Sequence, residues 1–132
     1  MTASEQLRAV ADEYWEARLE ASPLYASFLG DHRYDDRADD VSVEAEQRLR
    51  SRWTEFRDQA SGIDADDLDE TDRVTRDLLA EELDDSIRSI DHRMIELASD
   101  QMQGAHAELL VIAGQLRAPE PEHARMAVAR IP

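Results

Sequence analysis

The residues best suited to chemistry gather in one short stretch, residues 31–37. Carboxylates, guanidinium groups, an imidazole and a phenol occupy seven consecutive positions just after a predicted helix end. Connecting segments of this kind lie at the surface and often carry function. The seven residues are Asp31, His32, Arg33, Tyr34, Asp35, Asp36 and Arg37.

The composition of this loop supports two interpretations. In the first, Arg33 and Arg37 pair with the aspartates, and the loop is an internal network of ion pairs and hydrogen bonds that fixes a turn. In the second, the same groups line a cleft and contact a ligand or another domain. The residues alone leave both interpretations open.

Histidines and acidic residues elsewhere form no recognisable metal motif. No two histidines are four positions apart and none precedes Glu, so the zinc motif His-Glu-x-x-His is absent. The acidic run 64–70 has Leu68 where a calcium loop needs an oxygen ligand, and acids at a helix start are a simpler interpretation. Glu120 and His123 have the spacing of half a di-iron site, without a second copy. The four histidines are His32, His92, His106 and His123.

Charge and cysteine content exclude further classes. The formal net charge is −16, with 15 cations, all arginine, against 31 acids. Binding to nucleic acid or to an anionic membrane needs clustered cations, so we expect neither partner. Residues 58–100 hold 15 acids and 4 arginines, which suits a solvated face or a surface for a basic partner. The chain has no Cys, which excludes disulfides, thiolate zinc sites and a Cys nucleophile.

No targeting or membrane segment is predicted. Glu5 stands near the N-terminus with no apolar run behind it, unlike a secretory signal. The longest uncharged stretch, Leu109–Leu116, is too short to span a bilayer. We therefore expect a cytoplasmic location.

The elements that must position the loop are predicted to be helices. Thr2 and Glu5 have the capping-box spacing and begin a helix that should end near Ala21. Ser22 and Pro23 are expected to cap and open a short helix over Leu24–Leu29, with Gly30 as its left-handed C-cap.

The next helix is predicted between Ser42, its N-cap, and Gly62, where it should stop. After the acidic run, Asp69 or Thr71 should cap a long helix. Its apolar stripe extends over five turns and needs a partner: Leu79, Leu83, Ile87, Ile90, Met94 and Leu97.

The remaining chain is predicted to contain a break near Gly104 and then an apolar run, Leu109–Ala113. We expect that run to be a buried helix, although its β-branched residues leave a strand possible. Pro121 should open a last helix over Glu122–Ile131. The predicted fold is all-α, a bundle of about five to six helices forming one unit over 1–132.

Three segments resemble a known family. The run from Asp12 to Arg37, containing Leu-Gly-Asp-His-Arg-Tyr-Asp-Asp-Arg, is similar to the N-terminal signature of the bacterial domain of unknown function 885 family. Asp72–Leu83 resembles a long helix of that family, and Gln101–Gly104 the turn that follows it. Ala105 stands where that turn is expected to have proline.

The resemblance implies a helical N-terminal portion of a longer protein. Members of the family look like zinc metallopeptidases, whose motif His-Glu-x-x-Pro-Gly-His-His lies downstream of the matched region. This chain has no counterpart of those residues, so no catalytic or metal-binding role passes to any position. The resemblance thus implies zinc only for the full-length proteins, and we expect this chain to be inactive alone.

Two functional hypotheses follow. In the first, the chain is the N-terminal helical part of a zinc-dependent peptidase, its partner is the missing C-terminal portion, and the 31–37 loop reaches the cleft. In the second, it is a stand-alone acidic helical module that binds a partner or a second copy of itself through the Leu79–Leu97 stripe.

Overall fold

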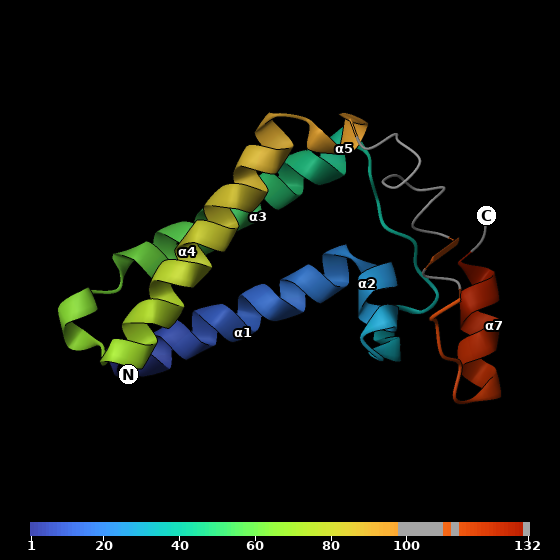
Figure 1. Ribbon diagram of the computed structural model, residues 1–132, viewed down its shortest axis with the longest axis horizontal. Helices are drawn as coiled ribbons and strands as arrows, with labels where there is room; N and C mark the ends of the chain where they lie inside the picture. The colour runs from blue at the N-terminus through green and yellow to red at the C-terminus, as the bar shows by residue number, and fades with distance from the viewer. Residues whose placement is uncertain (98–109, 112–113, 131–132) are drawn as a thin grey trace. The chain divides into compact units, whose positions relative to one another are not determined.

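The computed structural model describes residues 1–97, 110–111 and 114–130, and all regular secondary structure in these ranges is helical (Figure 1). The prediction of an all-α fold is confirmed. The residues group into two compact units. Unit 1 comprises residues 1–17 and 42–94, and unit 2 comprises residues 18–41 and 95–132. That the chain forms a single unit stays a prediction.

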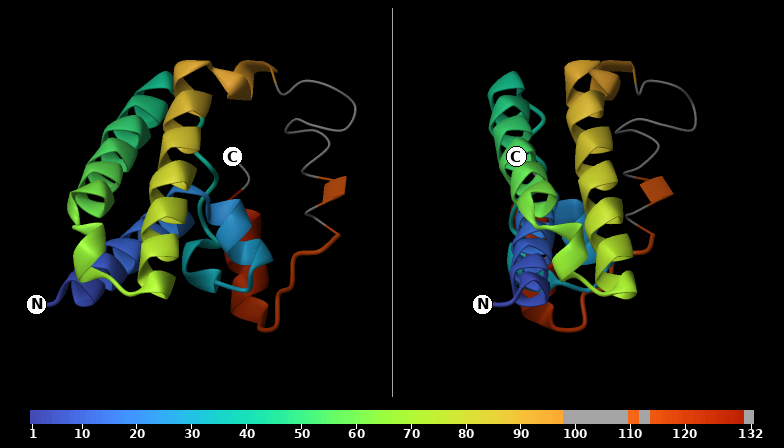
Figure 2. Two further views of the ribbon diagram at one scale, coloured as in Figure 1. Left: turned by 60° about the vertical axis from the view of Figure 1, so that its left-hand side comes forward. Right: turned by 90° about the vertical axis from the view of Figure 1, so that its left-hand side faces the viewer.

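Unit 1 is a three-helix bundle with an apolar core. It contains most of α1 (Ala3–Ala21), together with α3 (Val43–Gly62) and α4 (Glu70–Asp91). The last two lie side by side (Figures 1 and 2). The buried core residues come from all three helices and from the α3–α4 connection: Leu7, Tyr14, Ala17, Trp53, Phe56, Ala60, Ile63, Leu68, Leu79, Leu83 and Ile87.

The apolar stripes predicted for α3 and α4 meet in this core. Tyr14 packs edge-on against Trp53, with ring centroids 5.4 Å apart and planes at 74°. It meets Phe56 in the same way at 6.1 Å. Edge-to-face aromatic pairs add a favourable quadrupole interaction to the apolar burial. The long stripe of α4 therefore finds a partner within its own unit over Leu79–Ile87.

Polar contacts join the surfaces of α3 and α4. Arg57 pairs with Asp84 at 3.0 Å, and Arg50 Nε donates to Asp91 Oδ1 at 2.6 Å. Arg76 donates to the carbonyl oxygen of Ser61 at 2.9 Å. These contacts sit outside the core and fix the mutual register of the two helices.

Two aspartates of the acidic run between α3 and α4 act as helix N-caps. Asp64 accepts a hydrogen bond from the backbone N of Asp66 at the start of the 3₁₀ helix η2 (Ala65–Asp67). Asp69 accepts from the backbone N of Asp72 at 2.8 Å and caps α4. Of the two caps considered, the structure uses Asp69. Ser42 caps α3 as predicted, and Thr2 and Glu5 form the reciprocal capping box of α1.

The prediction that one helix continues to Leu97 is wrong. The helix α4 ends at Asp91, and Arg93 adopts a left-handed φ of 53° before the short helix α5 (Met94–Leu97). The backbone N–H groups of His92 and Arg93 bond to the carbonyls of Arg88 and Ile90, which closes the helix end. The apolar repeat continues through the break, since a single left-handed residue leaves no trace in hydrophobic spacing.

Unit 2 contains the other helical pieces and few buried apolar residues. Its helices are α2 (Pro23–Phe28), the 3₁₀ helix η1 (His32–Tyr34) and α7 (Pro121–Ala129), which Pro121 opens as predicted, and it also includes the C-terminal end of α1 and residues 95–97 of α5. The buried residues of unit 2 in the described ranges are Leu19, Pro23, Ala26, Ser27 and Asp35.

The apolar run Leu109–Ala113 was expected to be buried, and this is wrong for its two described residues. Leu110 and Val111 are helical and 82% and 60% exposed. The other residues of the run, the predicted turn at Gly104 and Ile131 lie outside the described residues. Local composition could not show that Leu110 and Val111 are exposed.

The cap of α2 also differs from the prediction. Ser22 makes no side-chain capping bond, and Asp39 accepts a hydrogen bond from the backbone N of Leu24 at 3.1 Å instead. A cap supplied by a residue after the helix is invisible to rules that read the preceding one. Gly30 has a φ of +87°, as predicted for the residue that ends this helix. Among the described residues, no helix has the length and apolar content needed to span a bilayer.

Candidate functional site

The first half of the 31–37 loop is built around Asp31. Its carboxylate accepts from the backbone N of Arg33 at 3.1 Å, which caps η1. It also pairs with the Arg33 guanidinium at 2.6 Å. The hydrogen bond from the Arg33 side chain lowers the pKa of Asp31 below its ordinary value, with smaller contributions from the backbone bond and nearby positive charge. Asp31 is therefore a structural anion that shapes the turn.

Asp35 is the buried centre of the loop, with 4% of its surface exposed. Ser27 Oγ, from α2, donates to Asp35 Oδ1 at 2.5 Å. His32 Nδ1 lies 2.8 Å from Asp35 Oδ2. A buried carboxylate is costly unless such partners replace its hydration. The loop thus places one carboxylate among groups from two helical segments.

Arg130, from α7, brings a cation to this carboxylate. Its Nη2 donates to Ser27 Oγ at 2.6 Å and to the backbone carbonyl of Tyr34 at 3.3 Å. The same nitrogen lies 3.7 Å from Asp35 Oδ1, and both side chains are almost fully covered. The guanidinium therefore joins α7 to α2 and to the loop in a single polar cluster.

A second contact between these segments is aromatic. The imidazole rings of His32 and His123 stack with centroids 4.2 Å apart and planes at 17°. His123 lies on α7, and Arg130 is the C-cap of this helix. The two residues are seven positions apart, so they lie on the same face of the helix. The His32–His123 stack and the hydrogen bonds of Arg130 together hold α7 against the loop. Figure 1 shows that α7 lies beside α2.

The other loop residues point outward. Arg33 and Arg37 lie over the ring of Tyr34, 5.3 and 5.4 Å from its centroid. Arg37 therefore stacks on an aromatic face, whereas the sequence suggested an aspartate partner. Asp36 is exposed. Whether this outer surface meets a ligand or another domain stays a prediction.

Ser27, Asp35 and His32 are the residue types of a hydrolytic triad, but their order is unsuitable for that chemistry. In a triad the imidazole contacts the serine and removes its proton, while the aspartate orients the imidazole from behind. Here Asp35 stands between Ser27 and His32, and Ser27 is only 5% exposed. The arrangement suits a structural hydrogen-bond network and does not activate a nucleophile.

The described residues do not assemble a zinc site. Across residues 1–97, 110–111 and 114–130, no group of three or more His, Cys, Asp or Glu residues is placed to hold a metal ion. His92 is the exposed C-cap of α4, and His106 lies outside the described residues. Glu120 meets His123 through a backbone bond, from the N of His123 to the carbonyl of Glu120.

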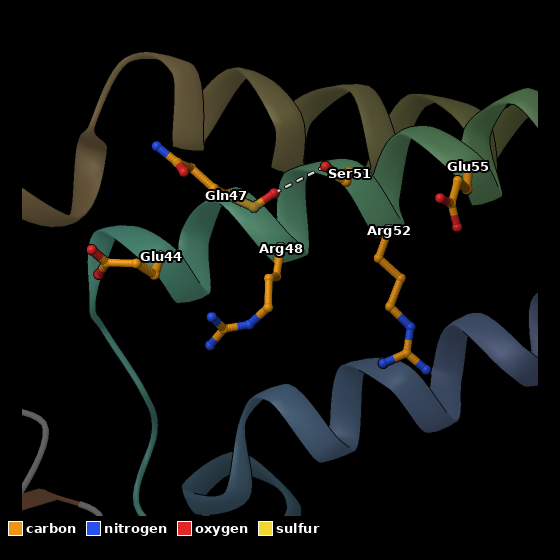
Figure 3. Close-up of a pocket in the computed structure, with 6 residues that line it drawn as sticks. All are labelled: Glu44, Gln47, Arg48, Ser51, Arg52 and Glu55. Carbon is orange, nitrogen blue, oxygen red and sulfur yellow. Dashed lines mark hydrogen bonds between the residues drawn. The ribbon is translucent and has the colours of Figure 1, made fainter.

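A shallow hollow also lies on the surface of α3. Figure 3 shows Arg48 and Arg52 projecting from the same side of the helix. Ser51 donates to the carbonyl of Gln47 at 3.2 Å, a bond within the helix. All the lining residues come from α3, so groups from different elements do not converge there as binding sites require. The lining residues are Glu44, Gln47, Arg48, Ser51, Arg52 and Glu55.

Three members of the polar cluster were missed from the sequence: Ser27, His123 and Arg130. Ser27 lies on α2, where its type carries no distinctive signal. The spacing of His123 and Arg130 places both on one face of a helix, which is a weak signal since nothing local shows what that face meets. Only the tertiary fold brings them to Asp35 and His32.

A comparison with protein families matches residues 23–132 to the family described as bacterial protein of unknown function (DUF885). The chain belongs to this family. The match begins at the first residue of α2 and includes the whole polar cluster, while α1 lies before it. The part of the resemblance from Pro23 onward is therefore confirmed by DUF885 membership. No curated protein and no solved structure matches the chain.

Proposed function

We propose that this chain is a non-catalytic helical part of a protein related to zinc peptidases, whose zinc ligands and reacting groups are supplied by residues outside these 132. DUF885 membership and the resemblance of its longer members to zinc metallopeptidases support the proposal. The sequence has no His-Glu-x-x-His motif from which the chain could build such a site itself. Its role is then to support and position other parts of the protein.

The observation that carries this proposal is the internal use of the family signature. Asp31 and Asp35 are engaged by Arg33, Ser27 and His32, so these two carboxylates of the signature shape a turn. A network held in this way suits a rigid support that fixes neighbouring elements. The exposed side chains of the loop, Arg33, Asp36 and Arg37, are the part available to border a cleft.

The first test is the reading frame beyond the Pro132 codon. We expect a helical continuation that carries His-Glu-x-x-Pro-Gly-His-His, in frame or after a shift. The continuation, the present chain and the two together are then compared for zinc content and peptide hydrolysis. Zinc should follow the continuation, and hydrolysis should require both parts. Stoichiometric zinc and hydrolysis by the present chain alone would overturn the proposal, as would the lack of any such continuation.

Matched variants make the supporting role testable. Asp35→Asn breaks the buried cluster and should reduce hydrolysis by the reassembled protein, with the zinc content unchanged. Asp36→Asn removes an exposed charge from the same loop and serves as the control. Equal hydrolysis by the two variants would show that the network does not support the site.

A second candidate function is self-association through α4. Leu79, Leu83 and Ile87 are covered within unit 1, but Val74 and Leu78 extend the apolar surface and are 54% and 65% exposed. Their i,i+4 spacing makes a stripe that a second copy could cover. Light scattering over a concentration series tests this: Leu78→Glu should abolish a dimer, and Ser51→Glu on α3 should not. A strictly monomeric wild-type chain removes this candidate.

A further inference from the structure

The contact between α7 and the 31–37 loop depends on groups that can gain protons. Its aromatic half is the stack of His32 on His123, at 4.2 Å. Its polar half is Arg130 with Ser27, the Tyr34 carbonyl and Asp35. Among the described residues, this contact contains no large aliphatic side chain that is fully buried. The charge state of the two imidazoles can therefore decide whether the contact holds.

The two histidines have different surroundings. His32 faces the Asp35 carboxylate at 2.8 Å, with Asp31 and Arg33 close by on the same loop. From α7 it meets the ring of His123, and Arg130 approaches the same Asp35 carboxylate. A proton on His32 completes an ion pair. The buried Nδ1 of His123, by contrast, makes no hydrogen bond in the part of the chain that is described.

A second proton therefore changes the balance. With one proton bound, a neutral ring stacks on an imidazolium, an arrangement that is attractive. With both rings charged, two like charges lie 4.2 Å apart, and the single Asp35 carboxylate already faces both His32 and Arg130. Like charges at this distance repel.

We propose that His32 and His123 form a proton-operated latch that holds α7 on the loop when at most one ring is charged and releases it when both are. Imidazole side chains in general change charge between about pH 5 and 8, so release of α7 is to be sought in that range. Release separates α7 from the loop and uncovers Asp35 and Ser27. This regulatory device does not depend on the proposed relation to peptidases.

Nuclear magnetic resonance of the labelled full chain tests the latch. At about pH 7.5 we expect nuclear Overhauser contacts between the rings of His32 and His123 and slow amide exchange in α7. At about pH 5 the ring contacts should disappear. Protection in α7, corrected for the intrinsic pH dependence of exchange, should fall by about tenfold or more while α3 in unit 1 keeps its protection.

Two variants identify the group responsible. His123→Phe keeps an aromatic ring that cannot gain a proton, so α7 should stay docked at about pH 5. His92→Gln removes the exposed histidine at the end of α4 and should release α7 like the wild type. Ring contacts and protection that persist at about pH 5 in the wild type would overturn the latch. Release of α7 at the same pH in His123→Phe would also overturn it, and would assign the effect to another group.

A salt series keeps the proposal testable if the Phe variant does not dock at all. Higher NaCl weakens repulsion between the two charged rings, so the midpoint of release in the wild type should move to lower pH. A midpoint that is unchanged or moves to higher pH contradicts a repulsive latch.

Discussion

The two units of this chain are held together by different kinds of interaction. Unit 1 buries a continuous apolar core from three helices, and its ion pairs lie on the surface. Unit 2 has few buried apolar residues, and at its centre lie a carboxylate, a serine hydroxyl, two imidazoles and a guanidinium.

This difference determines how each unit responds to change. Apolar burial is non-directional and depends on area and packing, so unit 1 should be sensitive to lost volume and should depend on pH only through its surface ion pairs. A buried polar network depends on geometry and charge state, so unit 2 should be sensitive to a single altered atom and to protonation. Of the segments that carry the family resemblance, the run from Leu29 to Arg37 lies in unit 2 and Asp72–Leu83 lies in unit 1.

The largest expected effect is from Leu83→Ala. Leu83 is fully buried in the core of unit 1, and truncating such a side chain removes apolar burial and leaves a cavity. The free energy of unfolding should fall by about 2–5 kcal/mol, measured by urea denaturation followed by circular dichroism. Leu78→Ala, 65% exposed on the same helix, should cost less than about 0.5 kcal/mol.

Leu83→Ala also tests whether the two units are stabilised independently of each other. If the units are stabilised independently, Leu83→Ala should leave the ring contacts of His32 and His123 intact under native conditions. Loss of those contacts at low urea would show that the apolar core also supports the polar cluster.

Asp35→Asn should have the next largest effect, confined to unit 2. The amide keeps the shape of the side chain but loses the charge that faces His32 and Arg130. A lost charged hydrogen-bond partner in a buried site costs about 1–3 kcal/mol. Amide exchange in residues 27–35 should accelerate accordingly, while α3 stays protected. Asp36→Asn, exposed in the same loop, should leave exchange unchanged.

Asp39→Ala should cost about 0.5–2 kcal/mol locally, since it removes the side chain that caps the N-terminus of α2. Ser22→Ala should cost a few tenths at most, because Ser22 makes no side-chain capping bond. Exchange of the Leu24 amide measures both. A larger effect from Ser22→Ala than from Asp39→Ala would indicate that Ser22 caps α2, as the sequence predicted.

The caps show how far sequence rules extend. Thr2, Ser42 and Asp69 cap the helices that directly follow them; Thr2 and Ser42 were predicted from local sequence, and Asp69 was one of two predicted alternatives. Asp39 caps a helix that precedes it by a turn and a loop, and no local rule links the two positions. Elements of unit 1 were predictable for a related reason, since helical periodicity reports which face is buried.

The polar cluster was predictable only in part. Composition indicated that residues 31–37 form either an internal polar network that fixes a turn or a surface that contacts a ligand or another domain. The partners His123 and Arg130 come from α7, far along the sequence, and hydrophobic periodicity carries no information about polar contacts. The end of α4 was also missed, because the left-handed Arg93 interrupts the helix without interrupting the apolar stripe.

The smallest expected effect concerns Asp91, which forms with Arg50 the same kind of pair that Asp35 makes with Arg130, but on the surface. The hydrogen bond from Arg50 lowers the pKa of Asp91 below its ordinary value of 3.8. A lowered pKa in the folded state means that the pair stabilises the fold above about pH 4, and that this contribution is lost as the pH falls through the folded-state pKa.

Asp91→Asn should therefore lower the urea midpoint slightly at neutral pH and not at all near pH 2, and high salt should remove the difference. Asp67→Asn removes an exposed carboxylate with no ion pair among the described residues, so its midpoint should not fall below the wild-type value. Both side chains of the Arg50–Asp91 pair are 45% exposed, whereas those of Arg130 and Asp35 are 11% and 5% exposed. An effect of Asp91→Asn as large as that of Asp35→Asn would mean that burial does not determine how strongly an ion pair stabilises each unit.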